Sequence, residues 1–267
     1  MAPGETSNTQ RQASPPQRAT RALRRAEQLV RRGQLGEAIQ SLHQALAFGA
    51  DRYDCYLRLA RLYKTCRQWP EAVSAARKAV EVHPDRLTAR EAVVALCLET
   101  RDFARAIDES KALLSRFPRH LPARDALGAA YIGIGDVVAA TRVASELIRL
   151  DPSDPTHRFK KALLCQHQGE NGMAVDEFQR VVAMAPDTDL ARSAREQLEV
   201  LDLHQLHSIL LLASDDPVFR VRLQRDPEEA LDERGFRLSE WGRDRLDDLV
   251  DEDLAGTEGC STPRLYH

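Results

Sequence analysis

The 267-residue chain lacks long hydrophobic runs, paired cysteines and, for its size, aromatic residues. Its longest uninterrupted apolar stretch, residues 92–98, is far shorter than the roughly 18 to 20 residues of a membrane helix, and the next candidate, residues 209–213, is shorter still. The five cysteines form no CxxC motif and the N-terminus has no signal-like apolar stretch, so we expect a reducing, cytoplasmic location. Aromatic residues make up only 5%. Any core must therefore use mainly aliphatic side chains and alanine, which suits closely packed helices.

The net charge gives no reason to expect a polyanionic partner for the whole chain. Lys and Arg number 38 against 41 Asp and Glu, a formal net charge of -3. We therefore expect neither a nucleic acid nor a membrane as partner. The charge is uneven, however, because residues 1–34 hold 7 basic and 2 acidic residues, whereas residues 215–255 hold 14 acidic and 7 basic ones.

Motifs of catalysis are also absent. The chain has no glycine-rich phosphate loop, hydrolase elbow or kinase signature. His204 and His207 lie three residues apart, but no third residue has the spacing of a zinc ligand. The sequence therefore predicts a protein that is not an enzyme and has no cofactor or metal.

What the chain does have is a repeat of constant length. Alanine recurs every 34 residues, at Ala38, Ala72, Ala106, Ala140 and Ala174. Twelve residues after four of these five alanines comes a proline, at Pro84, Pro118, Pro152 and Pro186. Proline ends a helix because it cannot donate to the helical ladder and disfavours helical geometry just before it. The pattern thus predicts that each repeat ends with a helix that stops at the proline.

These residues resemble the tetratricopeptide repeat, a 34-residue helix-turn-helix unit. Residues 53–86 match best, with Tyr56, Leu59, Ala60, Tyr63, Ala72, Ala79 and Pro84. We set the units at 19–52, 53–86, 87–120, 121–154 and 155–188. The resemblance implies an all-α, right-handed superhelical solenoid of antiparallel helix pairs. This sequence departs from the family where Arg25 and Lys161 replace leucine, and where three arginines replace the early aromatic residue: Arg90, Arg124 and Arg158.

The flanking segments lack this period. We expect residues 1–18 to be disordered, because they hold three prolines and no apolar periodicity. Residues 189–203 fit a capping helix, residues 204–254 an acidic helical module, and residues 255–267 a flexible tail. Within the module we expect short helices over 206–214, 217–224, 227–233 and 240–250.

The family resemblance also implies a binding surface, because ligands are usually contacted from the first helix of each unit. The candidate groove residues are Leu57, Arg61, Lys64, Glu91, Leu98, Glu99, Asp125, Ile132, Phe159, Leu163 and His167. Their charges predict a protein or peptide segment with an acidic group near the second unit and a basic group near the third and fourth. The Lys and Asn pair of a carboxylate clamp is absent. The alternative is that these are ordinary solvated side chains.

The end of the chain suggests a second function. Residues 213–246 resemble the helical leader of nitrile-hydratase-like precursor peptides, and also the small helical subunit of extradiol ring-opening dioxygenases. The tail then holds Cys260, Ser261 and Thr262, residue types that peptide-modifying enzymes cyclise or dehydrate. The main hypothesis is a bacterial-type, non-catalytic adaptor of undefined oligomeric state. The alternative is a substrate or accessory subunit of a ribosomal-peptide modification pathway, and a frayed C-terminus is the simpler explanation of the tail.

Overall fold

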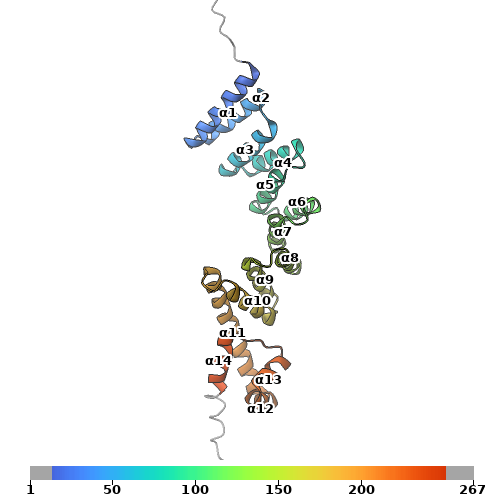
Figure 1. Ribbon diagram of the computed structural model, residues 1–267, viewed down its shortest axis with the longest axis vertical. Helices are drawn as coiled ribbons and strands as arrows, with labels where there is room; N and C mark the ends of the chain where they lie inside the picture. The colour runs from blue at the N-terminus through green and yellow to red at the C-terminus, as the bar shows by residue number, and fades with distance from the viewer. Residues whose placement is uncertain (1–13, 251–267) are drawn as a thin grey trace, which may run out of the picture. The chain divides into compact units, whose positions relative to one another are not determined.

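The computed structural model describes residues 14–250, and over that range helices joined by short turns and loops make up the fold (Figure 1). The chain divides into two units, the first ending at Ile134 and the second beginning at Gly135. The helices of the first unit are α1 (Pro15–Arg31), α2 (Leu35–Ala47), α3 (Arg52–Thr65), α4 (Trp69–Val82), α5 (Leu87–Glu99), α6 (Phe103–Arg116) and α7 (Leu121–Gly133). Those of the second are α8 (Val137–Leu150), α9 (Pro155–His167), α10 (Asn171–Met184), α11 (Asp189–Asp215), α12 (Pro217–Arg225), α13 (Pro227–Glu233) and α14 (Glu240–Leu249). No described helix is long and apolar enough to cross a membrane.

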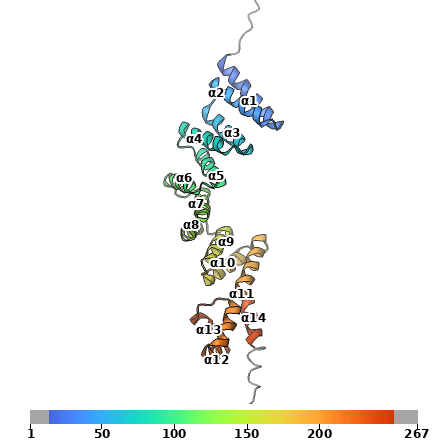
Figure 2. The ribbon, with the colours of Figure 1, turned by 180° about the vertical axis from the view of Figure 1, so that it is seen from behind.

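Within each unit, a repeat helix packs against the next one along the chain, as α1 with α2 and α3 with α4 do in both Figure 1 and Figure 2. The alanines that recur every 34 residues are all at most 1% exposed. An alanine at the contact lets two helix backbones approach closely, and this explains why the chain needs so few aromatic residues. The all-α fold class is confirmed.

The turn inside each helix pair places one residue in the left-handed region, again every 34 residues. These residues are Gly33 (φ 76°), Arg67 (φ 57°), Arg101 (φ 58°), Gly135 (φ 79°) and Gly169 (φ 77°). After four of them the next backbone N–H donates to the carbonyl five residues earlier, for example Gln68 to Tyr63 at 2.9 Å. This geometry ends a helix without loss of hydrogen bonds and suits glycine best. Arg67 and Arg101 adopt it at a steric cost.

Two of the arginines that replace the early aromatic residue have a structural role. Arg90 Nε donates to the carbonyl oxygen of Pro84 at 2.9 Å, and Arg124 Nη1 donates to that of Pro118 at 2.7 Å. Each guanidinium thus satisfies a carbonyl in the loop between two helix pairs. Arg158, in the fifth repeat, bonds to Glu177 instead.

The first helix begins earlier than expected. α1 starts at Pro15, inside the segment 1–18 that we expected to be disordered, whereas residues 1–13 lie outside the described residues. Proline suits the first turn of a helix, because its missing N–H would have no intrahelical partner there. The backbone N–H of Ser14 also donates to Gln17 Oε1 at 3.1 Å. Pro15 and Pro16 therefore start a helix rather than prevent one.

The expected boundary at residue 204 is absent. α11 runs unbroken from Asp189 to Asp215, since no proline or glycine interrupts it. Its N-terminal half packs against α9 and α10 through Ala194, Leu198 and Leu201. Its C-terminal half supplies Leu206 and Ile209 to the core of α12–α14. One helix is thus shared between the last repeat and the C-terminal module.

Two buried polar side chains of α11 hold the start of α14. The carboxylate of Asp202 is fully buried and accepts from both the backbone N–H, at 2.9 Å, and the hydroxyl of Ser239. The Gln205 side chain exchanges hydrogen bonds of 2.9 and 3.0 Å with the backbone of Arg237. Ser239 in turn caps α14 by accepting from Gly242 N at 3.3 Å. Burial raises the pKa of Asp202, although the hydrogen bonds from Ser239 oppose that shift.

Gly242 is required by this arrangement. A Cβ atom at this position would lie 2.5 Å from Cγ of Asp202 and 2.8 Å from each of its carboxylate oxygens. Because Asp202 is buried and hydrogen-bonded, it has no free space to move.

Candidate peptide-binding surface

Adjacent first helices of the third and fourth repeats present an apolar surface in the first unit. α5 and α7 contact each other, and their equivalent positions carry Ala95 with Ala129 and Leu98 with Ile132. Both alanines are exposed, Leu98 is half-buried and Ile132 is 55% exposed. We call these four residues the α5–α7 patch. Exposed apolar side chains on neighbouring helices are typical of interaction surfaces.

Gly133 shapes the edge of this patch. A Cβ atom at Gly133 would lie 2.5 Å from the ring of Phe103, so the α6 aromatic ring packs directly on the α7 backbone. The close approach holds the end of α7, and with it Ile132, against the start of α6. The 34-residue pattern did not single out this glycine.

Leu57 is not on the open surface. We expected it to present an apolar group to a ligand, but it is only 8% exposed and packs with Tyr53, Ala79 and Ala89. Its side chain belongs to the core between the second and third repeats, because the next helix pair covers that position of α3. The expectation for this residue is corrected.

Three of the charged candidates already have partners in the described structure. Lys64 on α3 forms an ion pair with Glu99 on α5. Glu91 Oε1 lies 2.9 Å from His120 Nε2, while His120 Nδ1 accepts from the Ala123 N–H at 3.1 Å. Because Nδ1 is an acceptor, the ring proton is on Nε2 and is donated to Glu91.

The other two charged candidates in the first unit differ in exposure. Asp125 is half-buried on α7. Arg61 is exposed on α3 and forms no ion pair with any residue of the described range. Arg61 is therefore the candidate that stays available to an acidic partner.

The candidates of the fifth repeat lie on α9, in the second unit. Phe159 is half-buried and its ring packs edge-to-face on Phe178, with 5.5 Å between the ring centroids. Leu163 is 39% exposed and His167 is exposed. Phe159 thus contributes to packing, and the other two are accessible.

A buried ionic cluster in the fifth repeat was not foreseen. Glu177 is 3% exposed and accepts from Arg158 at 3.0 Å, Lys161 at 3.0 Å and Arg180 at 3.1 Å. Burial by itself would raise the pKa of Glu177, but the hydrogen bonds from Lys161 and Arg158 lower it overall. Lys161 in place of the family leucine was the available sequence signal. The cluster is structural, because three side chains enclose its carboxylate.

Three of the described cysteines are buried, whereas the two histidines considered as metal ligands are on the surface. Burial raises the pKa of the Cys55, Cys97 and Cys165 thiols, that of Cys97 to about 11, so they stay protonated near neutral pH. His204 and His207 are both exposed, and no group of three potential metal ligands occurs within residues 14–250. Cys260, Ser261 and Thr262 lie outside the described residues.

Two family models match the sequence, and both describe the tetratricopeptide repeat. They cover residues 29–97 and 127–199. The chain carries tetratricopeptide repeats. Repeats of this kind are generally non-catalytic modules for protein interaction, so the coarse part of the functional prediction is supported. The resemblance of the C-terminal module to precursor leaders stays a prediction.

Solved structures of tetratricopeptide-repeat proteins are similar to the chain. One from Parabacteroides merdae ATCC 43184 has a TM-score of 0.61 at 17% identity, covering 91% of this chain and 97% of that one. MamA (41 to end) from Desulfovibrio magneticus RS-1 has a TM-score of 0.56 at 17% identity, with coverages of 64% and 97%. YrrB, described as a TPR protein with an unusual peptide-binding site, has a TM-score of 0.54 at 15% identity, with coverages of 67% and 92%. At such identities the similarity shows the fold alone, and no curated protein matches the sequence.

Proposed function

We propose that the protein is a non-catalytic scaffold that binds a protein or peptide segment on the α5–α7 patch. The exposed apolar surface of Ile132 beside Leu98 carries this proposal. Removing apolar surface from water contributes about 25 cal/mol per Å², so a partner that covers these side chains gains affinity there. The patch lies on the helices from which tetratricopeptide repeats usually contact ligands.

The partner segment combines apolar side chains with an acidic group. Arg61 is exposed and without an ion pair in the described range, so it can receive a carboxylate. Glu99 already pairs with Lys64 on α3, and Glu91 with His120 just before α7, which removes the reason to expect a basic group opposite them. The proposed ligand is therefore an acidic and apolar segment, a narrower class than the sequence suggested.

Substitution of Ile132 tests this surface. The full-length chain is used to capture partners from its source cells, and a captured partner is then titrated against the purified protein. Ile132→Asp should weaken binding roughly tenfold or more, because a charge replaces an apolar contact in a desolvated interface. Val138→Asp is the matched control, since Val138 is 63% exposed on α8 outside the patch. Equal affinity of the wild-type and Ile132→Asp proteins for every captured partner would refute the proposal.

A charge substitution separates the two parts of the surface. Arg61→Glu should weaken the same complex and reduce its dependence on salt, because exposed charges are screened over about 8 Å at physiological ionic strength. An unchanged salt dependence would remove Arg61 from the interface and leave the apolar patch as its only described component.

A further inference from the structure

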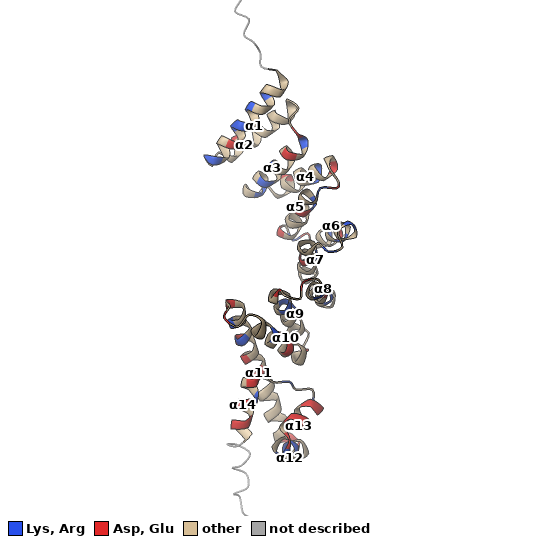
Figure 3. Cartoon of the chain, viewed as in Figure 1, with Lys and Arg blue, Asp and Glu red and all other residues tan. Residues whose placement is uncertain are grey.

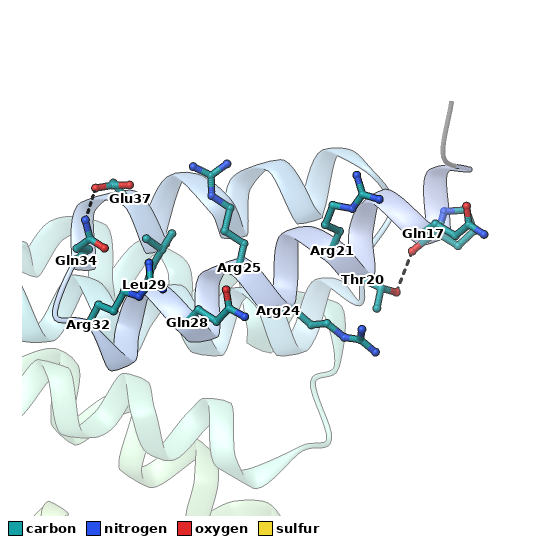
Figure 4. A pocket seen from close by; sticks show the side chains of 11 residues that line it. Gln17, Thr20, Arg21, Arg24, Arg25, Gln28, Leu29, Arg32, Gln34 and Glu37 are labelled. Atoms are coloured by element: carbon teal, nitrogen blue, oxygen red, sulfur yellow. Dashed lines mark hydrogen bonds between the residues drawn. The ribbon is translucent and has the colours of Figure 1, made fainter. Parts of the chain in front are cut away.

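The first helix carries a strongly basic exposed face. Four arginines line a hollow of about 1080 Å³ on α1 and the start of α2 (Figure 4): Arg21, Arg24, Arg25 and Arg32. We call these four residues the α1 basic face. None of them forms an ion pair within the described residues. The one carboxylate that lines the hollow, Glu37, already accepts from Gln34 Nε2 at 2.9 Å.

The repeat explains why this face is open. The residues 34 positions after Arg21 and Arg25 are Cys55 and Leu59, each 1% exposed. Cys55 is buried against the first helix pair, in a cluster with Ala19, Ala22 and Ala45. Arg21 and Arg25 thus occupy positions that a preceding helix pair covers in the next repeat. Among the described residues no such pair precedes α1, so its outer face meets solvent.

Exposure of the outer face of α1 to solvent does not by itself require that all its charges be positive. A polar cap with mixed charges would serve equally well, and like charges spaced four residues apart, as in Arg21 and Arg25, destabilise a helix slightly. The first turn of α1 also lacks the acidic residues that a helix N-terminus favours. These small unfavourable terms disappear when an acidic partner covers the face.

The last described helix offers the complementary charge. α14 carries Glu240, Asp244 and Asp247 on one exposed side, and Gly242 and Leu246 on the opposite, buried side. We call the three carboxylates the α14 acidic face. Within the described residues none of the three forms an ion pair. The arginines of α14 are already engaged, Arg243 with Glu228 and Arg245 with Asp248, each at 3.7 Å. Figure 3 shows basic residues along α1 and acidic residues on α13 and α14.

The charged residues on the α1 basic face and on the α14 acidic face have the same spacing along their helices. Arg21 and Arg25 lie four residues apart on a helix, as do Glu240 and Asp244, which is about 6 Å along each axis. Two such helices can pair arginine with carboxylate at successive turns. We propose that the α1 basic face of one chain binds the α14 acidic face of a second copy, so that the protein associates head to tail. This contact uses neither the α5–α7 patch nor Arg61, and so it is independent of the proposed function.

Charge reversal on each face tests the contact. Sedimentation velocity of the full chain is measured at low and high NaCl, because screening should dissociate the copies. Arg21→Glu with Arg25→Glu, and separately Asp244→Lys with Asp247→Lys, should each weaken self-association roughly tenfold or more. All four residues are exposed, so the fold should persist, and circular dichroism checks this. A mixture of the two variants should associate again, because each supplies the charge that the other lacks.

A matched control tests specificity. Arg77→Glu with Arg142→Glu makes the same change in net charge on α4 and α8, and it should leave self-association unchanged. The proposal is overturned if the wild-type chain stays monomeric at low salt, if the control weakens association equally, or if the mixture does not recover. Binding of a short RNA to α1 without self-association would also overturn it, in favour of a nucleic-acid partner. A change in hydrodynamic radius at constant monomer mass would do so as well, in favour of a contact within one chain.

Discussion

The repeats and the C-terminal module are both helical, yet different interactions hold them together. In α1–α10 the contacts that recur are alanines at most 1% exposed, one in each repeat. In the module, Asp202 and Gln205 of α11 bind the segment that leads into α14 through buried hydrogen bonds. Apolar packing tolerates exchange of similar side chains, whereas a buried carboxylate requires particular donors. The module should therefore be the more sensitive part to single substitutions.

The largest effect is expected for Asp202→Ala. The change leaves the backbone N–H and hydroxyl of Ser239 without their buried acceptor, at a cost of about 2–4 kcal/mol to the attachment of α14. Native-state hydrogen exchange should show faster exchange of the α14 amides and unchanged exchange of the α3 amides. Asp202→Asn, which keeps one acceptor oxygen, should lose less. Equal loss of protection in α3 and α14 would erase the contrast between the two regions.

Gly242→Ala should follow, at about 1–3 kcal/mol of destabilisation from overpacking. Alanine improves helix propensity by about 1 kcal/mol, but its Cβ would lie 2.5 Å from Cγ of Asp202. Gly36→Ala in α2 is the matched control, because nothing lies within 4 Å of its Cβ, and it should be neutral or stabilising. Urea unfolding of both variants measures the difference.

A double substitution sharpens this test. If the clash with Asp202 causes the loss, then Gly242→Ala should cost less in an Asp202→Ala background, because neighbouring changes are not additive. Strict additivity of the two free energies of unfolding would argue against a direct contact.

Acid should affect the repeats through Glu177. Its folded pKa is below its ordinary value of 4.5, so its contribution is present above pH 4.5 and is lost as pH falls through the folded pKa. Glu177→Gln should cost about 1–2 kcal/mol at neutral pH, because its hydrogen bonds to the three cations lose their charge, and it should make the stability less dependent on pH below 4.5. The pH dependence expected from Asp202 is opposite. Because its folded pKa is raised above 3.8, its contribution to the free energy of unfolding is greatest below pH 3.8 and falls as pH rises through the folded pKa. Urea unfolding at several pH values distinguishes the contributions of Glu177 and Asp202. If the free energy of unfolding of wild type and of Glu177→Gln fell in parallel below pH 4.5, Glu177 would not be the group responsible.

The smallest effect is expected in the turns within the repeats. Arg67→Gly and Arg101→Gly should each stabilise the protein by about 0.5 kcal/mol, because glycine adopts a positive φ without steric cost. Gly169→Ala, at φ 77° with open space around it, should destabilise by about 1 kcal/mol. Thermal unfolding measures all three, and a loss of stability in either glycine variant would indicate that the arginine side chain itself contributes to the fold.

Most of the helix pattern could be predicted from local sequence. The recurring alanines and prolines located the helix pairs, and the short helices expected over 217–224, 227–233 and 240–250 correspond to α12, α13 and α14. Two local expectations were wrong. Pro15 and Pro16 begin α1 instead of preventing a helix, and α11 continues past residue 204 because no proline or glycine interrupts it.

The candidate surface was harder to predict because exposure depends on neighbouring helices. Position in the repeat placed Leu57 and Ile132 on equivalent helices, but only packing shows that Leu57 is covered and Ile132 is open. The pairing of Lys64 with Glu99 is likewise invisible in either helix alone, since the two residues lie on successive repeats. These contacts decide which side chains remain available to a partner.

The sequence by itself determined the helices, their period and the turns between them, because these follow from hydrogen bonds and steric limits within a few residues. The tertiary structure decided which surface stays open and how the C-terminal module is attached. The bond from Ser239 to Asp202 joins residues 37 apart in the chain, and it forms only when α14 folds back on α11. Such a contact has no characteristic residue spacing by which it could be recognised in the sequence, because intervening loops of many lengths would permit it.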